Sequence, residues 1–245
     1  MGGGDLAIVL IAIVAGSILK SLTGMGLPAI AIPVMSFFVG IETAVVVVSL
    51  PNFALNAALA VQERRWLPET RDLPVLAVAS LLGAAAGSVL FISVSEEPLV
   101  VLLLISVVGY VVAFLTRPEV AVSADLSKKL APGVGLVGGL FQGAIGISGP
   151  ILGSWIHSYR LNRGVHVLSL TLLFLVSGTT QFVILVATGE LTGLWLASIL
   201  GCIPALATVP AASRLRGQLS THVFDYLVIL AITVAGLGLG IRTFF

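Results

Sequence analysis

Most of this sequence is divided into apolar stretches that are long enough to cross a lipid bilayer. Of its 245 residues, 58% are hydrophobic and only 9% are charged, and the mean hydropathy is +1.16. A soluble domain carries about 25% charged residues, because its surface must face water. A transmembrane helix needs about 20 apolar residues, and the chain offers about eight such blocks. The composition therefore predicts an all-α integral membrane protein with little sequence left for a soluble domain.

The same composition argues against several other classes of protein. The formal net charge is +1, and no basic stripe interleaved with aromatic residues indicates nucleic-acid binding. The single cysteine, Cys202, cannot form an internal disulfide, and no cluster of residues has metal-ligand spacing. We therefore expect no metal, no cofactor and no nucleic-acid partner. The N-terminal MGGGD lacks a positively charged segment, so the first apolar stretch is interpreted as mature protein.

Two apolar stretches, 6–39 and 130–159, are interrupted by glycine and proline. The interruptions have the sequences TGMGLP, beginning at Thr23, and GISGP, beginning at Gly146. The polar segment 117–129 between the two stretches is interpreted as a cytoplasmic linker. It joins a first repeat, 1–116, to a second repeat, 130–245, within one membrane domain. Uninterrupted helices are expected at 43–61, 73–94, 98–115, 165–188, 194–212 and 223–241.

The two halves resemble one another when the chain is shifted by 122 residues. The shift aligns Gly16 with Gly138, Lys20 with Gln142, Gly24 with Gly146, and Pro28 with Pro150. Equivalent loops then differ in the sign of their charge. The loop 40–42 is acidic and its equivalent 160–163 is basic, and the members of two further pairs of loops also carry opposite charges. Because Lys and Arg collect in cytoplasmic loops, the halves are predicted to be inverted repeats.

Inversion requires each interrupted stretch to form a broken or re-entrant helical hairpin, with three transmembrane helices completing each repeat. Ten basic residues then lie on the cytoplasmic side, and only Arg242 lies on the other side of the membrane. The ten are Arg64, Arg65, Arg71, Arg117, Lys128, Lys129, Arg160, Arg163, Arg214 and Arg216. Full crossing by both interrupted stretches would divide these residues more evenly between the two sides. We therefore expect the hairpins, with both termini on the non-cytoplasmic side.

Two interruptions that meet from opposite faces predict a substrate site near the bilayer midplane. Irregular backbone at this depth is tolerated only where it is buried in protein or lines a wet cavity. Free N–H groups at the helix starts favour an anion, and a lysine in an apolar run would add positive charge. The predicted substrate-binding residues are Lys20, Thr23, Gly24, Gly26, Asn52, Gln142, Gly146, Ser148 and Gly149.

Each of these features also has a plainer explanation. Glycine and proline kink many transmembrane helices, and Lys20 could extend its ammonium group to the interface. Asn52 and Asn56, four residues apart, either line a cavity or hydrogen-bond neighbouring helices. His157 and His166 flank a cytoplasmic loop, as interfacial residues or as part of a proton relay.

The segment GSILKSLTGMGLP, which begins at Gly16, and its second copy GGLFQGAIGISGP, which begins at Gly138, resemble the sulfite exporter TauE/SafE family. The duplicated layout and the length agree, so the resemblance covers essentially the whole chain. It implies a secondary transporter in the cell inner membrane that moves sulfite, sulfoacetate or related organosulfonates. The sequence contains no P-loop, which fits transport without an ATPase domain.

An anion channel is the alternative function, and saturable, gradient-coupled flux would separate it from a transporter. An enzyme is not expected, because no acidic pair and no histidine lies deep in a predicted span. The expected partners are the small anionic substrate and membrane lipid. Proton or sodium coupling and a homo-oligomer are left open.

Overall fold

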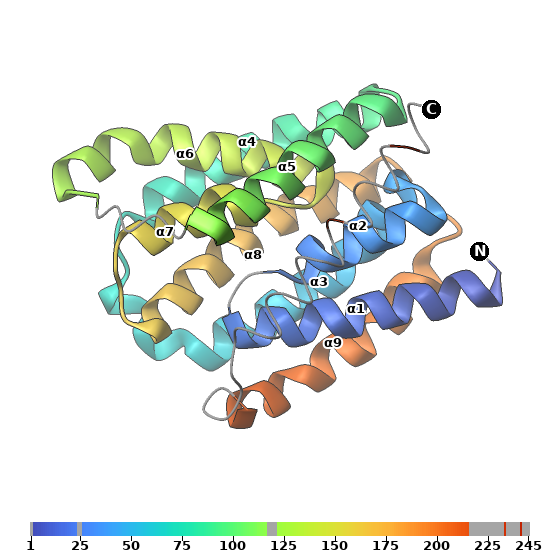
Figure 1. Ribbon diagram of the computed structural model, residues 1–245, viewed down its shortest axis with the longest axis horizontal. Coiled ribbons are helices and arrows are strands. Elements are labelled where there is room, and N and C mark those ends of the chain that lie inside the picture. The colour runs from blue at the N-terminus through green and yellow to red at the C-terminus, as the bar shows by residue number, and fades with distance from the viewer. Residues whose placement is uncertain (1, 24–25, 117–121, 216–232, 234–240, 242–245) are drawn as a thin grey trace.

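The computed structural model describes residues 2–23, 26–116, 122–215, 233 and 241, and this part of the chain is helical without a β-strand (Figure 1). Most helices begin and end within a few residues of their predicted positions. The helix predicted at 223–241 lies outside the described residues except at Thr233 and Ile241. The elements are α1 (Gly3–Thr23), α2 (Leu27–Val39), α3 (Ile41–Glu63), the 3-10 turn η1 (Arg64–Glu69), α4 (Leu73–Ser93), α5 (Glu96–Thr116), α6 (Ala124–Ile145), the π-helical turn η2 (Gly149–Gly153), α7 (Ser154–Ser158), α8 (Arg163–Ala187) and α9 (Trp195–Leu215).

Helix α6 begins at Ala124, within the segment 117–129 that is predicted to link the two repeats. Ser123 caps this helix, since its side chain accepts a hydrogen bond of 3.4 Å from the backbone N–H of Leu126. Asp125 in the first turn also suits the positive end of a helix. Asp125, Lys128 and Lys129 are therefore exposed residues of the first turns of a helix, whereas Ser127 in the same turns is buried.

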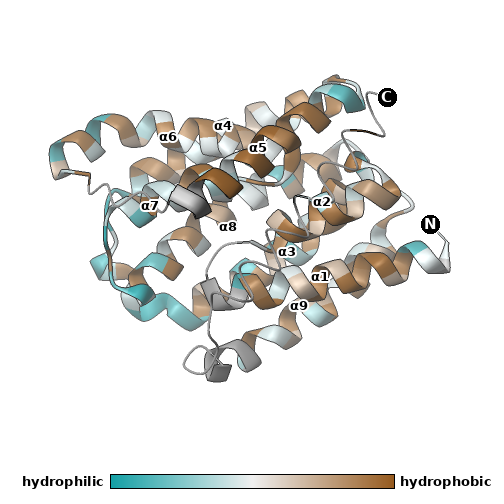
Figure 2. Cartoon of the chain, in the orientation of Figure 1, coloured by the Kyte–Doolittle hydropathy of each residue, from teal (hydrophilic) through white to brown (hydrophobic). Residues whose placement is uncertain are grey.

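Three segments are long and apolar enough to cross a membrane: Ile41–Glu69, Leu73–Ser93 and Arg163–Ala187. The segments Leu27–Val39 and Trp195–Pro210 are shorter apolar helices. Figure 2 shows hydrophilic residues concentrated toward the ends of the helices and hydrophobic residues along their middle parts. This distribution is that of an integral membrane protein whose helices run across a bilayer.

Each interrupted stretch folds back on itself. Helix α2 runs antiparallel to α1, and the short segment η2–α7 returns antiparallel to α6 (Figure 1). At 1.5 Å per residue, α1 and α6 are each just over 30 Å long, enough to span the hydrocarbon core, whereas the return arms are about 15 to 20 Å long. The return arms therefore begin partway along the helices on which they pack.

The third helix of each predicted half packs against the interrupted helix of the other half. Helix α4 contacts α6 and α8, and α9 contacts α1 and α3. The described helices other than α5 therefore form two interleaved bundles, which we call the α4 bundle (α4, α6, η2, α7 and α8) and the α9 bundle (α1, α2, α3 and α9). The two bundles meet where α3 packs against α8.

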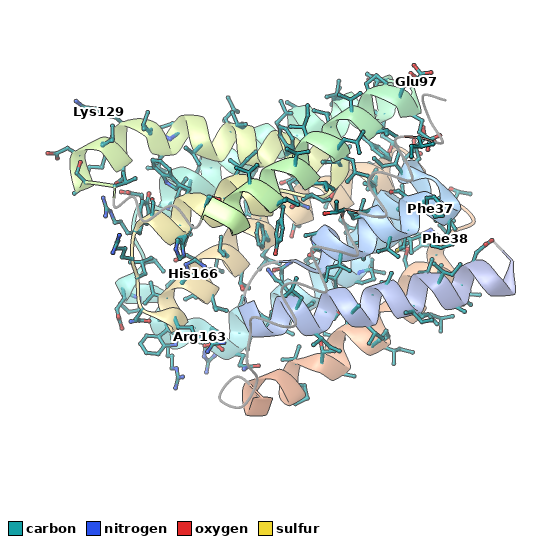
Figure 3. The ribbon with its side chains drawn as sticks, in the orientation of Figure 1. Phe37, Phe38, Glu97, Lys129, Arg163 and His166 are labelled. Carbon is teal, nitrogen blue, oxygen red and sulfur yellow. The ribbon has the colours of Figure 1, made fainter. Side chains whose placement is uncertain are left out.

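The predicted basic loops lie together at one end of the molecule. The side-chain amide of Asn162 donates a 3.0 Å hydrogen bond to Glu69, and Gly164 packs against the ring of Trp66. Lys129 and Arg163 lie at this end, whereas Glu97 lies at the opposite end (Figure 3). The two basic loops therefore lie at the same end of the described structure.

Candidate functional site

A pocket lies where the two interruptions meet, between the two bundles. The cavity itself is small, about 10 Å³ or room for about one water molecule, within about 240 Å³ of space that includes open solvent. Six of the nine predicted site residues line it, and they come from both halves of the sequence. The lining residues are Gly26, Pro28, Ala29, Asn52, Gln142, Gly146, Ile147, Ser148, Gly149 and Phe174.

Three predicted site residues are not part of this lining. Lys20 is fully buried but does not line the pocket. Gly24 and the side chain of Thr23 lie outside the described residues. The sequence analysis missed Phe174 as well as the apolar residues Pro28, Ala29 and Ile147. Nothing in the spacing of apolar residues along α8 distinguishes Phe174 from its neighbours.

Glycines with positive φ make both interruptions. Gly26 has φ 113° and directly precedes α2, and Gly146 has φ 72° and directly follows α6. A side chain at either position would be strained, because L-residues rarely adopt these angles. A methyl group on Gly146 would also lie 2.6 Å from Ile32 of α2. The tip of the second hairpin therefore packs directly on the first.

Each return arm begins with a proline in its first turn, Pro28 in α2 and Pro150 in η2. Proline costs nothing there, because the first N–H groups of a helix lack partners within the helix. The N–H groups of Leu27 and Gly149 occupy the first positions of the two arms. Pro28 and Gly149 line the pocket, so the first turns of both return arms reach it.

Amide side chains make the polar part of the site. The hydroxyl of Ser148 donates to Gln142 Oε1 at 2.9 Å, and Gln142 Nε2 donates to Gln181 Oε1 at 3.3 Å. Gln181 Nε2 in turn donates to the carbonyl of Gly143 at 3.1 Å. On α3, Asn56 Nδ2 donates to both the carbonyl and the side-chain oxygen of Asn52, at 2.8 and 2.9 Å. These contacts join buried residues of α3, α6 and α8.

The ammonium group of Lys20 lies 4.2 Å from the centroid of the Phe174 ring, within the range of a cation–π interaction. Phe174 also lines the pocket. The Phe174 ring therefore contacts the buried lysine and also forms part of the pocket wall.

Residues near the basic end hold the second hairpin in place. Asp72 Oδ2 accepts hydrogen bonds from the hydroxyls of Ser127 (2.5 Å) and Tyr159 (3.1 Å), which connects α4, α6 and the end of α7. Burial and the neighbouring Asp72 carboxylate raise the pKa of Tyr159 to about 12. Tyr159 is therefore a neutral hydrogen-bond donor at physiological pH, and the cluster anchors the return arm outside the pocket.

His157 and His166 lie side by side, with ring centroids 6.1 Å apart. Figure 3 places His166 toward the basic end of the molecule, and neither histidine lines the pocket. Among the described residues, no group of three or more His, Cys, Asp and Glu side chains could hold a metal ion.

These features define a class, a helical membrane protein with a polar site between two broken helices, which is how secondary transporters are built. The model of the sulfite exporter TauE/SafE family matches residues 8–239, nearly the whole chain, and the protein belongs to this family. The predicted resemblance is therefore confirmed, and the family consists of membrane transporters rather than enzymes. No curated protein and no solved structure matches the chain.

Proposed function

We propose that the protein is a secondary transporter that moves small sulfur-containing anions, such as sulfite, sulfoacetate or related organosulfonates, across the cell inner membrane by alternating access. The observation that carries this proposal is the composition of the pocket. None of its lining residues is acidic, and the lining includes Asn52, Gln142 and Ser148, whose side chains carry hydrogen-bond donors. An oxyanion has several acceptor oxygens and could satisfy many of these donors at once.

The proposed topology has two inverted repeats and both termini on the non-cytoplasmic side. Two observations support it. Each interrupted stretch returns toward the end from which it came (Figure 1), and the two basic loops are in contact through Asn162 and Glu69. The predicted repeat alignment is also consistent, because Gly16 and Gly138 both allow a return arm to approach. A methyl group would lie 2.5 Å from the Leu27 carbonyl and 2.6 Å from Leu152 Cγ, respectively.

The two bundles, rather than the two halves of the sequence, are the bodies that we expect to move in alternating access. The pocket takes Gly26 and Asn52 from the α9 bundle, and Gln142 and Ser148 from the α4 bundle. A shift along the contact between α3 and α8 would open the pocket first to one side and then to the other.

The binding test uses Gly149, because a methyl group there would contact nothing within 4 Å although the residue lines the pocket. Gly26 is less suitable, since its φ of 113° would strain any side chain. We expect sulfite or sulfoacetate to raise the unfolding temperature of the purified wild-type protein. The variant Gly149→Val should fold but lose this stabilisation. The control Gly133→Val should retain it, because Gly133 lies in α6 away from the pocket and an added Cβ there has no atom within 4 Å.

Transport in proteoliposomes separates the transporter from the alternative, an anion channel. Saturable sulfite flux that depends on a proton or sodium gradient supports a transporter. Flux that rises linearly with sulfite concentration and ignores both gradients would favour a channel. A wild-type protein that no sulfur-containing anion stabilises, and that passes none, would overturn the proposed function.

A further inference from the structure

We propose that Asn56 and Gln181 are positioning residues, which orient the amides of Asn52 and Gln142 so that their NH₂ groups face the pocket. This inference rests on the proposed function, because it explains how the pocket would select anions. Neither residue lines the pocket, and both are buried, with exposed fractions of 0% and 2%. A side-chain amide carries an acceptor and a donor in nearly the same shape. A site built from amides therefore favours anions only if something fixes their orientation.

On α3 the orientation starts from the backbone. The carbonyl of Asn52 can only accept, so the group of Asn56 that lies 2.8 Å from it must be the NH₂ group. That same NH₂ group lies 2.9 Å from the side chain of Asn52, which must therefore present Oδ1. The Nδ2 end of Asn52 is then turned away from Asn56 and is the end left for the pocket.

A second relay on α6 and α8 also starts from a backbone carbonyl. The carbonyl of Gly143 fixes the NH₂ group of Gln181, at 3.1 Å, so Gln181 presents Oε1 to Gln142. Gln142 therefore presents Nε2 to Gln181, and its Oε1 accepts from Ser148. One hydrogen of the Gln142 NH₂ group is used by Gln181, and the other remains available.

The two oriented NH₂ groups converge beside Gly178. A methyl group on Gly178 would lie 3.2 Å from Asn52 Nδ2 and 4.0 Å from Gln142 Nε2. One donor belongs to the α9 bundle and the other to the α4 bundle, and both residues line the pocket. Two donors from opposite sides can bind two oxygens of one oxyanion, whereas amides turned the other way would present two acceptors and repel it.

A structural role for the relays is the competing explanation, because buried amides need hydrogen-bond partners in any protein. Both explanations predict lower stability when Asn56 or Gln181 is replaced. Only a positioning role predicts a specific loss of anion affinity that depends on the amide at position 52. The experiment therefore measures affinity and stability separately.

The dissociation constant for sulfite is measured by calorimetry on the purified full-length protein. We expect Asn56→Leu and Gln181→Met each to weaken binding on the order of tenfold, the value of one hydrogen bond to a charged group. In an Asn52→Ser background, Asn56→Leu should have no further effect, because a hydroxyl can turn its proton toward the anion without help. The control Ser177→Ala removes a buried hydrogen bond of α8 outside the relays and should leave the affinity unchanged.

Three results would overturn the inference. The first is wild-type affinity in both Asn56→Leu and Gln181→Met. The second is an undiminished effect of Asn56→Leu in the Asn52→Ser background, and the third is an equal loss in Ser177→Ala. If Asn56→Leu does not fold, the sulfite affinity of Gln181→Met, compared with that of Ser177→Ala, tests the inference. Failure of the proposed function is distinguishable, because it would appear in the wild-type protein as absence of binding to sulfite, sulfate and sulfoacetate alike.

Discussion

Phe174 is the residue that connects the buried charge to the pocket. Its ring contacts the ammonium group of Lys20 at 4.2 Å and also lines the pocket. Lys20 is fully buried, and a cation–π contact with the ring would stabilise its charged form by about 0.5 to 2 kcal/mol. Phe174 is thus the described residue that contacts both the Lys20 side chain and the pocket.

We predict that Lys20→Met abolishes or strongly weakens sulfite transport and leaves the fold intact. Lys20 is the one basic side chain among the predicted site residues, and methionine keeps much of its length and apolar contact with Phe174. Flux in proteoliposomes and the unfolding temperature are the measurements. Phe174→Leu should instead tighten sulfite binding, because it removes from the pocket wall the ring that contacts the ammonium group, and this gain should vanish in the Lys20→Met background. Normal transport by a correctly inserted Lys20→Met protein would reduce Lys20 to a structural role.

At the scale of single elements, the closest helix contact depends on glycine. The glycines at the contact between α4 and α6 are Gly83 and Gly87 in α4, and Gly135, Gly139 and Gly143 in α6. A methyl group on Gly83 would overlap the carbonyl oxygen of Leu136, and one on Gly139 would overlap that of Ser80. Small residues at four-residue spacing allow helix backbones to approach closely in a membrane, where packing drives association. The pair α4–α6 is therefore held at backbone contact.

We predict that Gly139→Leu destabilises the protein by about 1–3 kcal/mol or more, because the added side chain must separate the two backbones. The matched control is Gly133→Leu in the same helix, where an added methyl group would meet nothing within 4 Å. The unfolding temperature in detergent is the measurement. Equal stability of the two variants would show that α4 and α6 are not in backbone contact.

The positions of the helices were more predictable from the sequence than the contacts between them. Glycine and proline at 23–28 and 146–150 located both interruptions, because these residues end helices whatever packs on them. The glycine spacing in α4 and α6 is equally visible, but it does not identify which helix each face meets. The position of the pocket could be predicted from the interruptions. The contacts of Phe174 with Lys20 and of Gln181 with Gln142 could not, because they join residues far apart in sequence.

For the whole molecule, the predicted topology has a direct test. Gln62, in the last turn of α3 before the first basic loop, and Asn162, in the second basic loop, are both exposed at the end where these loops meet. With Cys202 replaced by alanine, we expect Gln62→Cys and Asn162→Cys to react with an impermeant maleimide only from the cytoplasmic side. The exposed Ser95→Cys, next to Glu96 and Glu97, should react only from the opposite side. Labelling of residues 62 and 162 from opposite sides would refute the inverted hairpins.

The interleaving of the two bundles also determines how the chain can be divided. Cutting within 117–123 separates the predicted repeats, but it also separates α4 from α6 and α9 from α1, which are partners in the fold. Each fragment would then expose a helix face built for backbone contact, such as Gly83 and Gly87 of α4. We therefore predict that neither fragment gives a stable protein when it is expressed alone.

The same two fragments should assemble when they are expressed together, because every contact between the fragments is noncovalent and the cut removes none of them. Co-purification through a tag on one fragment, followed by the sulfite-dependent rise in unfolding temperature, measures this assembly. Gly139→Leu in the second fragment should reduce the yield of the complex, since the contact of α6 with Ser80 of α4 then has to form between separate chains. A single fragment that purifies as a stably folded protein would show that the sequence repeats, rather than the interleaved bundles, are the folding units.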